Sequence, residues 1–490
     1  MRRSTSLIAA GAATALSALV AASPILAQGG QGSAGGAENL PAGAATSDQP
    51  SAEPEAQPSV QSSLGPYGDP GGFRADLQGR GITYSFTYIG ETFGVASGGQ
   101  RRGGIYEGRL DGQLDLDLDK LLGWKGATFH TNFYQIHGHG LSRYYLGNLF
   151  TTSSIEALSS TRLFELWVEQ KLLDDKLAIR VGQLAADTEF ITSQYGGLFV
   201  NATYGWPAIT GSNLPSGGPA YPLATPGARV KWQATDQLTL MGAIFNGDPA
   251  GNGPGDPQIN NPSGTEFRLR DPAFLIGEAA YSYNQGKDDS GLPGTIKLGA
   301  WHHLGRFDHQ RFAAPTPDAP ALLLADPSSS GVARRLRGNS GIYAVFDQLL
   351  YREAGSKDQG LGMFARVSAS PNDRNLISFY ADGGLTYKGL FPNRPDDTMG
   401  VSVAYARISS AARDFDADTA FFNPDTFNPI RSSEAMLEVT YQAQIVPGWT
   451  VQPDFQYIRR PGANVLNPRS PSPEVVKDAA IVGLRTTIRY

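Results

Sequence analysis

Residues 434–458 read EAMLEVTYQAQIVPGWTVQPDFQYI, and the prediction of an all-β fold begins from this stretch. Apolar and polar side chains alternate over its first twelve positions, and the alternation returns after Val446-Pro447-Gly448. A period of two is typical of a β-strand with one apolar and one polar face. The short connection keeps both apolar faces on the same side. We therefore predict a β-hairpin of two half-buried strands.

An amphipathic hairpin fits two classes of protein. In a soluble β-sandwich, the polar face of each sheet meets bulk water and the apolar face packs inside. In a transmembrane barrel, the apolar face meets lipid and the polar face lines a wet lumen. The hairpin alone does not separate these alternatives, so the rest of the chain has to do so.

The N-terminus has the pattern of an export signal. Arg2 and Arg3 precede an apolar run at residues 7–22, and small Ala27 precedes a polar stretch. This order predicts a secretory signal peptide over residues 1–27 that is cleaved near Ala27. The run is too short and too rich in alanine to remain as a membrane helix.

Composition separates a leader from the folded domain. Residues 28–72 are rich in Gly, Ala, Pro and Ser, and they predict a flexible periplasmic leader because they offer little apolar surface to bury. Residues 73–490 are then the barrel domain. The chain has no cysteine, which excludes disulfides and thiolate metal sites. Its net charge of −6 is unclustered, and without a basic stripe we exclude nucleic acid as a partner.

Strand alternation recurs from residue 81 onward. It is clearest at 109–118, where leucines alternate with charged residues, because a helical period would scatter the carboxylates all round. The count is about sixteen strands of about ten residues, as single-chain outer-membrane barrels require. Segments near 274, 296 and 342 alternate poorly, so the pattern fixes the count to within about two. The predicted strands cover residues 82–88, 109–118, 126–137, 162–172, 176–183, 227–234, 237–246, 273–284, 294–303, 341–351, 360–369, 375–385, 398–408, 434–446, 449–458 and 479–490.

The connections between these segments alternate between long and short. Long connections are expected at 91–107, 138–161 and 184–226, with short ones such as 173–175 between them, and 370–374 is one exception. Outer-membrane barrels have this asymmetry, with short periplasmic turns and long external loops. A sandwich has no reason to place its long loops at one end. The sequence therefore predicts an all-β fold, a transmembrane antiparallel β-barrel of the outer-membrane porin type.

Further motifs follow one another between about residue 80 and the C-terminus. They are Val181-Gly-Gln183, Phe199-Val-Asn201 before Gly205-Trp-Pro207, Tyr343 with Asp347-Gln348, Asp373-Arg-Asn375, Gly383-Gly-Leu-Thr-Tyr-Lys-Gly-Leu390, Arg394-Pro-Asp-Asp397, and Trp449 to Ile458 followed by Pro461-Gly462. Together they resemble the carbohydrate-selective porin (OprB) family. The resemblance implies a sixteen-stranded barrel that passes sugars by diffusion through a constriction of inward-folded loops. The long leader departs from the family pattern, as does Gly448-Trp449 where relatives carry Trp-Trp.

The connection at 184–226 is the candidate constriction loop, because the third external loop of porins of this size commonly folds into the lumen. It contains the aromatic residues Tyr195, Tyr204 and Trp206 among small and polar residues. Sugars present apolar C–H faces that pack on aromatic rings, while their hydroxyls take polar partners. We therefore place these three residues on the solute path. The alternative is that they pack the loop onto the barrel wall.

Strand alternation also assigns charged side chains to the lumen, since a charge facing lipid near mid-membrane costs about 2–4 kcal/mol. Of these, Arg109, Arg180 and Arg229 are our candidates for donors to sugar hydroxyls, as the family resemblance implies, and Glu165 is placed beside them on the path. The alternative is a solvated lumen with ordinary ion pairs. The full inward set is Arg109, Arg180, Arg229, Lys231, Arg366, Arg485, Arg489, Asp111, Asp115, Asp117, Glu165, Glu169, Glu434, Glu438 and Asp454.

The predicted function is the passive diffusion of mono- or small oligosaccharides across the bacterial outer membrane. A general or anion-preferring porin is the alternative, and a secreted all-β hydrolase or adhesin is the third reading. No catalytic or cofactor motif supports an enzyme: Asp115 and Asp117 lack partners converging across a cleft, and the histidine pairs 137/139 and 302/303 lack a third metal ligand. We predict no cofactor and no metal.

The expected partners follow from this location. They are carbohydrate solutes, outer-membrane lipid and lipopolysaccharide, and the barrel-assembly machinery. The last segment, 479–490, ends on Tyr490 and resembles the C-terminal sorting strand that this machinery reads. As an edge strand of a soluble sheet it would leave a long edge unpaired. The sequence allows a monomer or a homotrimer.

Overall fold

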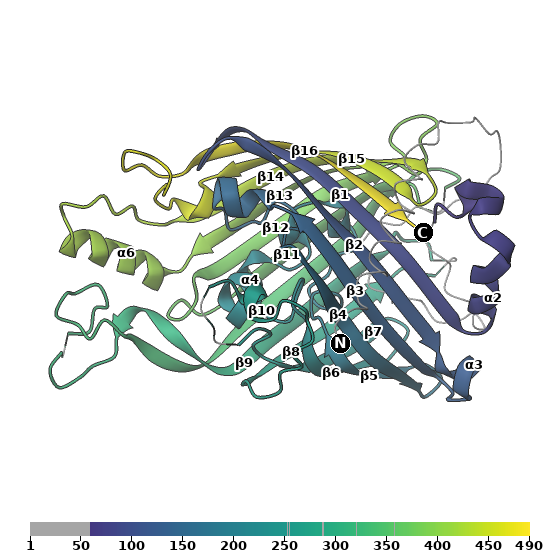
Figure 1. The fold of residues 1–490 in the computed structure, drawn as a ribbon, viewed down its shortest axis with the longest axis horizontal. Coiled ribbons are helices and arrows are strands. Elements are labelled where there is room, and N and C mark those ends of the chain that lie inside the picture. The colour runs from purple at the N-terminus through teal and green to yellow at the C-terminus, as the bar shows by residue number, and fades with distance from the viewer. Residues whose placement is uncertain (1–58, 252, 254, 287–288, 320, 357) are drawn as a thin grey trace, which may run out of the picture. The chain divides into compact units, whose positions relative to one another are not determined.

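A computed structural model describes residues 59–490, except residues 252, 254, 287–288, 320 and 357. The described residues form sixteen strands that close into one antiparallel barrel, in which β1 pairs with both β2 and β16 (Figure 1). The strands are β1 (Ile82–Gly99), β2 (Gly103–Asp117), β3 (Ala127–Gly138), β4 (Ser160–Leu172), β5 (Leu177–Leu184), β6 (Thr225–Gln233), β7 (Leu238–Asn246), β8 (Ala273–Tyr283), β9 (Gly294–Ala313), β10 (Ala333–Arg352), β11 (Gly360–Ala369), β12 (Ile377–Lys388), β13 (Thr398–Ile408), β14 (Ser433–Val446), β15 (Trp449–Arg459) and β16 (Lys477–Arg489). The predicted porin-type barrel is confirmed.

In the described part of the chain, the helices lie ahead of β1 and in the connections between strands. The α-helices are α2 (Phe73–Gly79), α3 (Leu118–Leu122), α4 (Ala208–Asn213), α5 (Pro257–Asn260) and α6 (Ser410–Phe422). Single turns of other helix types are η1 (Ser62–Tyr67), η2 (Pro70–Gly72), η3 (Ser142–Leu146), η4 (Gly196–Leu198), η5 (Ala202–Tyr204), η6 (Pro215–Gly217) and η7 (Pro461–Ala463). None of the helices in the described part of the chain is long and apolar enough to span a bilayer.

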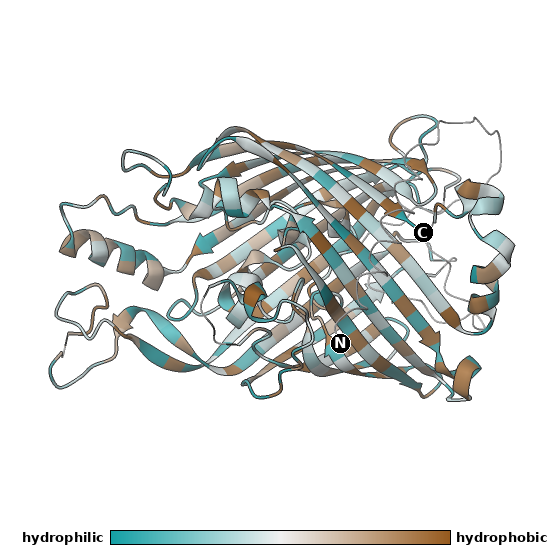
Figure 2. Ribbon diagram, viewed as in Figure 1, coloured by the Kyte–Doolittle hydropathy of each residue, from teal (hydrophilic) through white to brown (hydrophobic). Residues whose placement is uncertain are grey.

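The hairpin of β14 and β15 has the predicted register. Leu437 lies opposite Tyr457 and Val439 opposite Phe455, so the apolar residues of both strands share the outer face. Glu438, between them on the inner face, is fully buried. Figure 2 shows the same alternation of hydrophobic and hydrophilic residues along the strands around the barrel. The barrel therefore presents an apolar exterior to lipid and a polar interior.

The predicted long connection at 91–107 was wrong. β1 continues to Gly99 and β2 begins at Gly103, so only residues 100–102 connect them. The inward residues Phe93 and Val95 are buried, but the outward positions between them carry no large apolar side chain. Hydrophobic alternation therefore fades where hydrogen bonds to β2 and β16 still hold the strand.

Two further strands extend beyond their predicted ends. β9 and β10 pair as far as Ala313 and Ala333, which shortens the predicted connection at 304–340 to residues 314–332. In Figure 1 this hairpin and α6 project from one end of the barrel, while α2, α3 and the C-terminus lie at the other. With short connections at 100–102 and 370–376 as exceptions, the long loops lie at the end opposite the C-terminus, as predicted.

The last residues of the predicted leader pack against the barrel end that carries the C-terminus. The Val60 N–H donates to the Arg489 carbonyl over 2.9 Å, and the Tyr490 hydroxyl donates to the Gly68 carbonyl over 2.7 Å. The predicted signal peptide and leader residues 28–58 lie outside the described residues. The chain therefore enters the barrel beside its own C-terminal strand.

We predict that Leu298→Arg on β9 impairs insertion into membranes. Leu298 is 61% exposed on the outer face, opposite Ala279 of β8 and Ala344 of β10. An arginine facing lipid near mid-membrane costs about 2–4 kcal/mol. Folding into lipid vesicles, followed by heat-modifiable migration on gels, should give a smaller folded fraction than the wild type. Leu298→Ala is the control, and equal folding of the two variants would contradict a lipid-facing position.

Candidate solute pathway

The connection between β5 and β6, residues 185–224, crosses the interior of the barrel. It leaves the wall at β5 and returns at β6, yet it contacts β14 and β15, which are six to eight strands away around the closed sheet. A segment that starts on one wall and bonds to the opposite wall must pass through the bore. The predicted inward folding of this loop is therefore present, and we call residues 185–224 the inner loop.

Carboxylates of the wall hold the backbone of the inner loop. Glu278 on β8 accepts a hydrogen bond from the Ile191 N–H over 3.0 Å. Glu438 on β14 accepts from the N–H groups of Val200 and Asn201 at 2.6 and 3.2 Å. Charge-assisted bonds of this kind are the stronger class of hydrogen bond. These carboxylates position the loop.

Arg366 on β11 holds the loop through its carbonyl groups. Its guanidinium donates to the carbonyls of Ile191, Thr203 and Gly205 at 2.9, 2.8 and 3.2 Å. It also forms a forked ion pair with Asp382 on β12, and the side chains of both residues are fully buried. Such a fork uses the planar geometry of arginine, which lysine lacks.

Several motif residues from the sequence lie at these anchoring contacts. Asn201 donates through Nδ2 to Oε1 of Gln456 over 3.0 Å, and Gln452 donates to the Leu198 carbonyl over 2.8 Å. Asp347 on β10 accepts from the Ser193 hydroxyl over 2.5 Å. Some residues of the sequence motifs that resemble the porin family therefore hold the inner loop to the wall. Sequence reasoning missed the anchoring role of Asp347.

The predicted path residues Arg180 and Arg229 lie together on the wall formed by β4, β5 and β6. Arg229 is 2% exposed and forms ion pairs with Glu169 on β4 and Glu189 of the inner loop at 2.6 and 2.7 Å. Arg180 shares Glu169 at 3.0 Å and lies 3.7 Å from the centre of the Trp167 ring. Arg180 is the more accessible of the two, so it meets the bore while Arg229 fixes the loop.

Arg109 lies on the neighbouring part of the same wall. Its guanidinium carbon is 4.7 Å from the ring centre of Tyr134 on β3 and 5.2 Å from that of Tyr221 in the inner loop. Glu165 is nearly buried, and its carboxylate accepts from the Ala185 N–H over 3.0 Å. Arg109 is thus held between aromatic rings, and Glu165 anchors the start of the inner loop.

The predicted aromatic residues of the inner loop have different surroundings. Tyr204 is 3% exposed and packs against Phe199 and Phe364, with ring centres 4.9 and 5.8 Å away. The half-buried Trp206 donates from its indole to the Gly217 carbonyl over 3.0 Å. Tyr195, also half-buried, covers the Cα of Gly362 on β11 so closely that a side chain there would collide with its ring. Their contact with solute stays a prediction.

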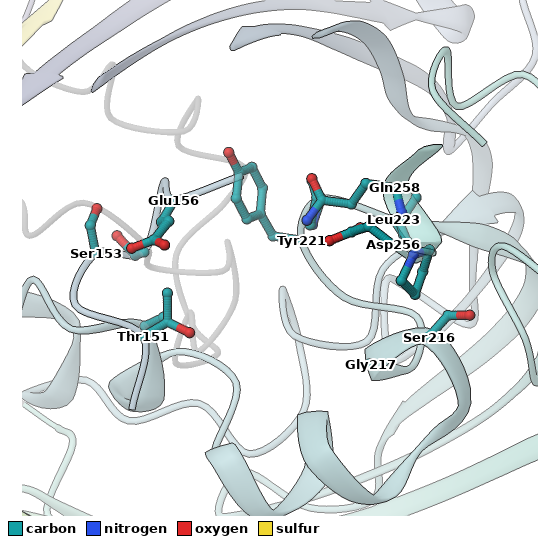
Figure 3. Close-up of a pocket in the computed structure, with 13 residues that line it drawn as sticks. Thr151, Ser153, Glu156, Ser216, Gly217, Tyr221, Leu223, Asp256 and Gln258 are labelled. Atoms are coloured by element: carbon teal, nitrogen blue, oxygen red, sulfur yellow. Dashed lines mark hydrogen bonds between the residues drawn. The ribbon is translucent and has the colours of Figure 1, made fainter. Parts of the chain in front are cut away.

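A cavity of about 340 Å³ lies among three long loops at the outer end (Figure 3). In Figure 3, Tyr221 stands between Glu156 and Ser153 of the β3–β4 loop on one side and Gln258 of α5 on the other. Its hydroxyl donates to the Ile155 carbonyl over 2.8 Å, which fixes the ring. The cavity is lined by Thr151, Ser153, Ser154, Glu156, Ala202, Ser216, Gly217, Tyr221, Pro222, Leu223, Asp256, Pro257 and Gln258.

Burial raises the pKa of four titratable groups of the inner loop, which are Asp187, Tyr195, Tyr204 and Tyr221. Burial raises the pKa of Asp187 to about 6, although the Tyr221 N–H, which donates to its carboxylate over 2.9 Å, acts in the opposite direction. Burial also raises the pKa of Tyr195 to about 12. At neutral pH the Asp187 carboxylate is mostly ionised and accepts this bond, whereas the Tyr195 phenol stays neutral.

Three comparisons identify the relatives of the chain. The sequence profile described as "Carbohydrate-selective porin, OprB family" matches residues 101–490. Porin B of Pseudomonas aeruginosa is 25% identical, with 81% of this chain and 86% of that protein aligned. Putative porin QuiX of Acinetobacter baylyi is 22% identical over 86% of this chain and 92% of that protein.

A solved structure has the same fold. The high-pH structure of Pseudomonas putida OprB matches with a TM-score of 0.74 and 22% identity, covering 86% of this chain and 97% of that one. The family profile covers most of the chain, including β2 to β16 and the inner loop. The chain therefore belongs to the carbohydrate-selective porin (OprB) family and is a bacterial outer-membrane channel for the passive diffusion of carbohydrates.

Proposed function

We propose that neutral mono- and small oligosaccharides cross this channel along the wall formed by β2 to β6. The observation that supports this path is the unequal exposure of inward side chains. On β13 to β15, Ser402, Glu438 and Gln456 are at most 1% exposed because the inner loop covers them. On the other wall, Asp115 and Arg180 keep 43% and 16% of their side chains exposed. The accessible part of the bore lies there.

The cavity at the outer end would receive the sugar first. Its volume of about 340 Å³ falls within the range of small-molecule sites, and hydroxyl and carboxylate groups surround the ring of Tyr221. Arg109 lies against the same ring, so Tyr221 contacts both the cavity and the arginine wall. Aromatic rings that pack on sugar C–H faces and charged groups that bond to hydroxyls are the chemistry a sugar path requires.

The charges on this wall favour a neutral solute over an anion. Four basic side chains face six acidic ones within the same part of the barrel, and ion pairs join several of them. A surplus of arginine would attract anions, whereas this mixed set without a basic surplus offers donors and acceptors to hydroxyls. The basic set is Arg109, Arg180, Arg229 and Lys231, and the acidic set is Asp111, Asp115, Glu165, Glu169, Asp187 and Glu189.

Arg109→Ala is expected to weaken the preference for sugar. Removing a charged donor to a sugar hydroxyl costs about 1.5–3 kcal/mol, so glucose permeation relative to an amino acid of similar size should fall about tenfold. Liposome swelling with purified protein measures this ratio. Trp206→Ala should have a smaller effect, because the Trp206 indole is bonded within the loop.

Lys477→Ala is the control, since Lys477 is an exposed cation at the start of β16, outside the wall formed by β2 to β6. Single-channel ion selectivity, measured in parallel, distinguishes a sugar channel from an anion-preferring one. If the wild type passed sugars and amino acids of equal size equally fast, the proposed carbohydrate preference would be lost. If the wild type preferred glucose over the amino acid and Arg109→Ala kept the same permeation ratio, the path would lie elsewhere in the bore.

We also propose that β16 serves as the sorting strand for the barrel-assembly machinery. It pairs with β15 and β1 and so closes the cylinder, and its apolar outward residues Val482 and Leu484 precede the aromatic terminus Tyr490. Deleting Tyr490 should reduce the amount of barrel in the outer-membrane fraction. Cross-linking in intact membranes would decide between a monomer and a homotrimer.

A further inference from the structure

Four arginines at the external end of the barrel project from its outer face without an acidic partner among the described residues. They are Arg306 on β9, Arg337 on β10, Arg407 on β13 and Arg459 on β15, and all four are exposed. Each lies in the half of its strand that leads to the long external loops. We call these four residues the arginine belt. They face away from the lumen, so the sugar path does not use them.

The belt begins where the apolar surface ends. On β13 the outward residues are Val401, Val403 and Tyr405, followed by Arg407. On β15 the order is Phe455, Tyr457 and then Arg459. Outer-membrane barrels have an apolar band flanked by aromatic girdles at both interfaces. One step beyond the aromatic girdle is the level of lipid headgroups.

Arg306 and Arg337 are unusual because they lie directly opposite each other in the β9–β10 ladder. Like charges in directly opposed positions destabilise a sheet. The next outward pair, Asp308 with Arg335, forms an ion pair at 3.3 Å, so this acid is already engaged. A bound anion between Arg306 and Arg337 would relieve the repulsion.

No acidic side chain in the described part of the chain forms an ion pair with any member of the belt. Arg407 lies 6.0 Å from the ring centre of Phe379, and Asp478, on the strand beside Arg459, accepts from the Arg460 N–H over 2.8 Å. Arginine forks match phosphate bidentately. The belt therefore has the charge for a phosphate site, with Arg407 and Arg459 one step beyond outward aromatic residues and Arg306 and Arg337 opposed as a pair.

We propose that the arginine belt binds the phosphate groups of lipid A in the outer leaflet. The acyl chains of that lipid lie against the apolar band, and its phosphates stand at the level of the four guanidinium groups. Basic residues beside a membrane gain about 1 kcal/mol each from anionic headgroups. A phosphorylated lipid is the occupant rather than free phosphate, because the belt is continuous with the surface that lipid already covers.

Native mass spectrometry of the purified porin in detergent tests this proposal with bisphosphorylated lipid A as the probe. The double variants Arg306→Gln/Arg337→Gln and Arg407→Gln/Arg459→Gln should each weaken the apparent Kd about thirtyfold. The matched control is Arg80→Gln/Arg352→Gln, which removes two exposed arginines at the opposite end of the barrel. The control should bind lipid A like the wild type.

Two further arms distinguish the source of the phosphate. Lipid A without phosphates should bind weakly to the wild type, and inorganic phosphate at the same concentration should not displace the bound lipid. Equal binding of the dephosphorylated lipid, or full displacement by inorganic phosphate, would overturn the proposal. Unchanged lipid A binding by both belt variants would also overturn it. Heat-modifiable migration and glucose permeation establish that each variant is folded.

Discussion

Arg366→Met is expected to release the inner loop and to widen the bore. The substitution leaves Asp382 as a buried charge without its partner and removes the donor to three loop carbonyls. Breaking one side of a buried ion pair costs about 3–5 kcal/mol. Single-channel conductance should rise, and liposome swelling should show permeation by oligosaccharides that the wild type excludes.

Two companions separate the loop effect from simple destabilisation. Arg366→Met/Asp382→Leu removes both charges and should recover much of the stability, because apolar replacement of a buried pair is often neutral. The loop carbonyls still lack their donor in that variant, so the wide bore should persist. Arg366→Lys keeps a cation beside Asp382 but not the fork, and should be intermediate. If the double variant had both normal stability and normal conductance, Arg366 would not anchor the loop.

Glu434→Ala is expected to loosen two external loops together. The fully buried carboxylate of Glu434 on β14 accepts from the N–H groups of Leu149 and Phe150 at 2.8 Å each, and from Gly462 over 2.6 Å. Each buried donor left without an acceptor costs about 1–3 kcal/mol. Limited proteolysis of the folded porin from the outside should cut the β3–β4 and β15–β16 loops faster than in the wild type.

The matched control is Glu474→Ala in the β15–β16 loop, whose carboxylate pairs with Lys477 at the surface over 3.3 Å. Surface pairs contribute little, so its protease sensitivity should match that of the wild type. Glu434→Gln keeps one acceptor oxygen and should lie between the two. Equal cleavage of Glu434→Ala and the control would mean that the loops are held by other contacts.

The alternation of apolar and polar residues predicted most of the barrel, because each strand places one set of side chains against lipid and the other against water or polar groups. Leu437 and Glu438 are adjacent, and each lies on the predicted side. The prediction failed at residues 91–99, where glycine and threonine face outward and the strand is held by hydrogen bonds to its neighbours. Such pairing leaves no trace in local hydrophobicity.

For the candidate site, alternation along the strands predicted which side chains face the lumen, but it did not predict their partners. Alternation along β6 places Arg229 towards the lumen. Its ion pair with Glu189 joins residues forty positions apart in the sequence, and it forms only because the inner loop folds back onto the wall. Asp382 was missed, although alternation along β12 from Tyr380 would have placed it inward. The packing of Tyr204 against Phe364 depends on tertiary contact, and the composition of the inner loop alone does not contain it.

The wall carboxylates have a consequence for how such channels diversify. They accept hydrogen bonds from peptide N–H groups, which every residue except proline supplies, so at Ile191, Val200 and Asn201 the backbone of the inner loop is held whatever the side chain. Substitutions at half-buried loop positions can therefore alter which molecules pass while the scaffold stays intact. A change of solute specificity can therefore evolve through a few substitutions in the loop, while the barrel keeps its fold.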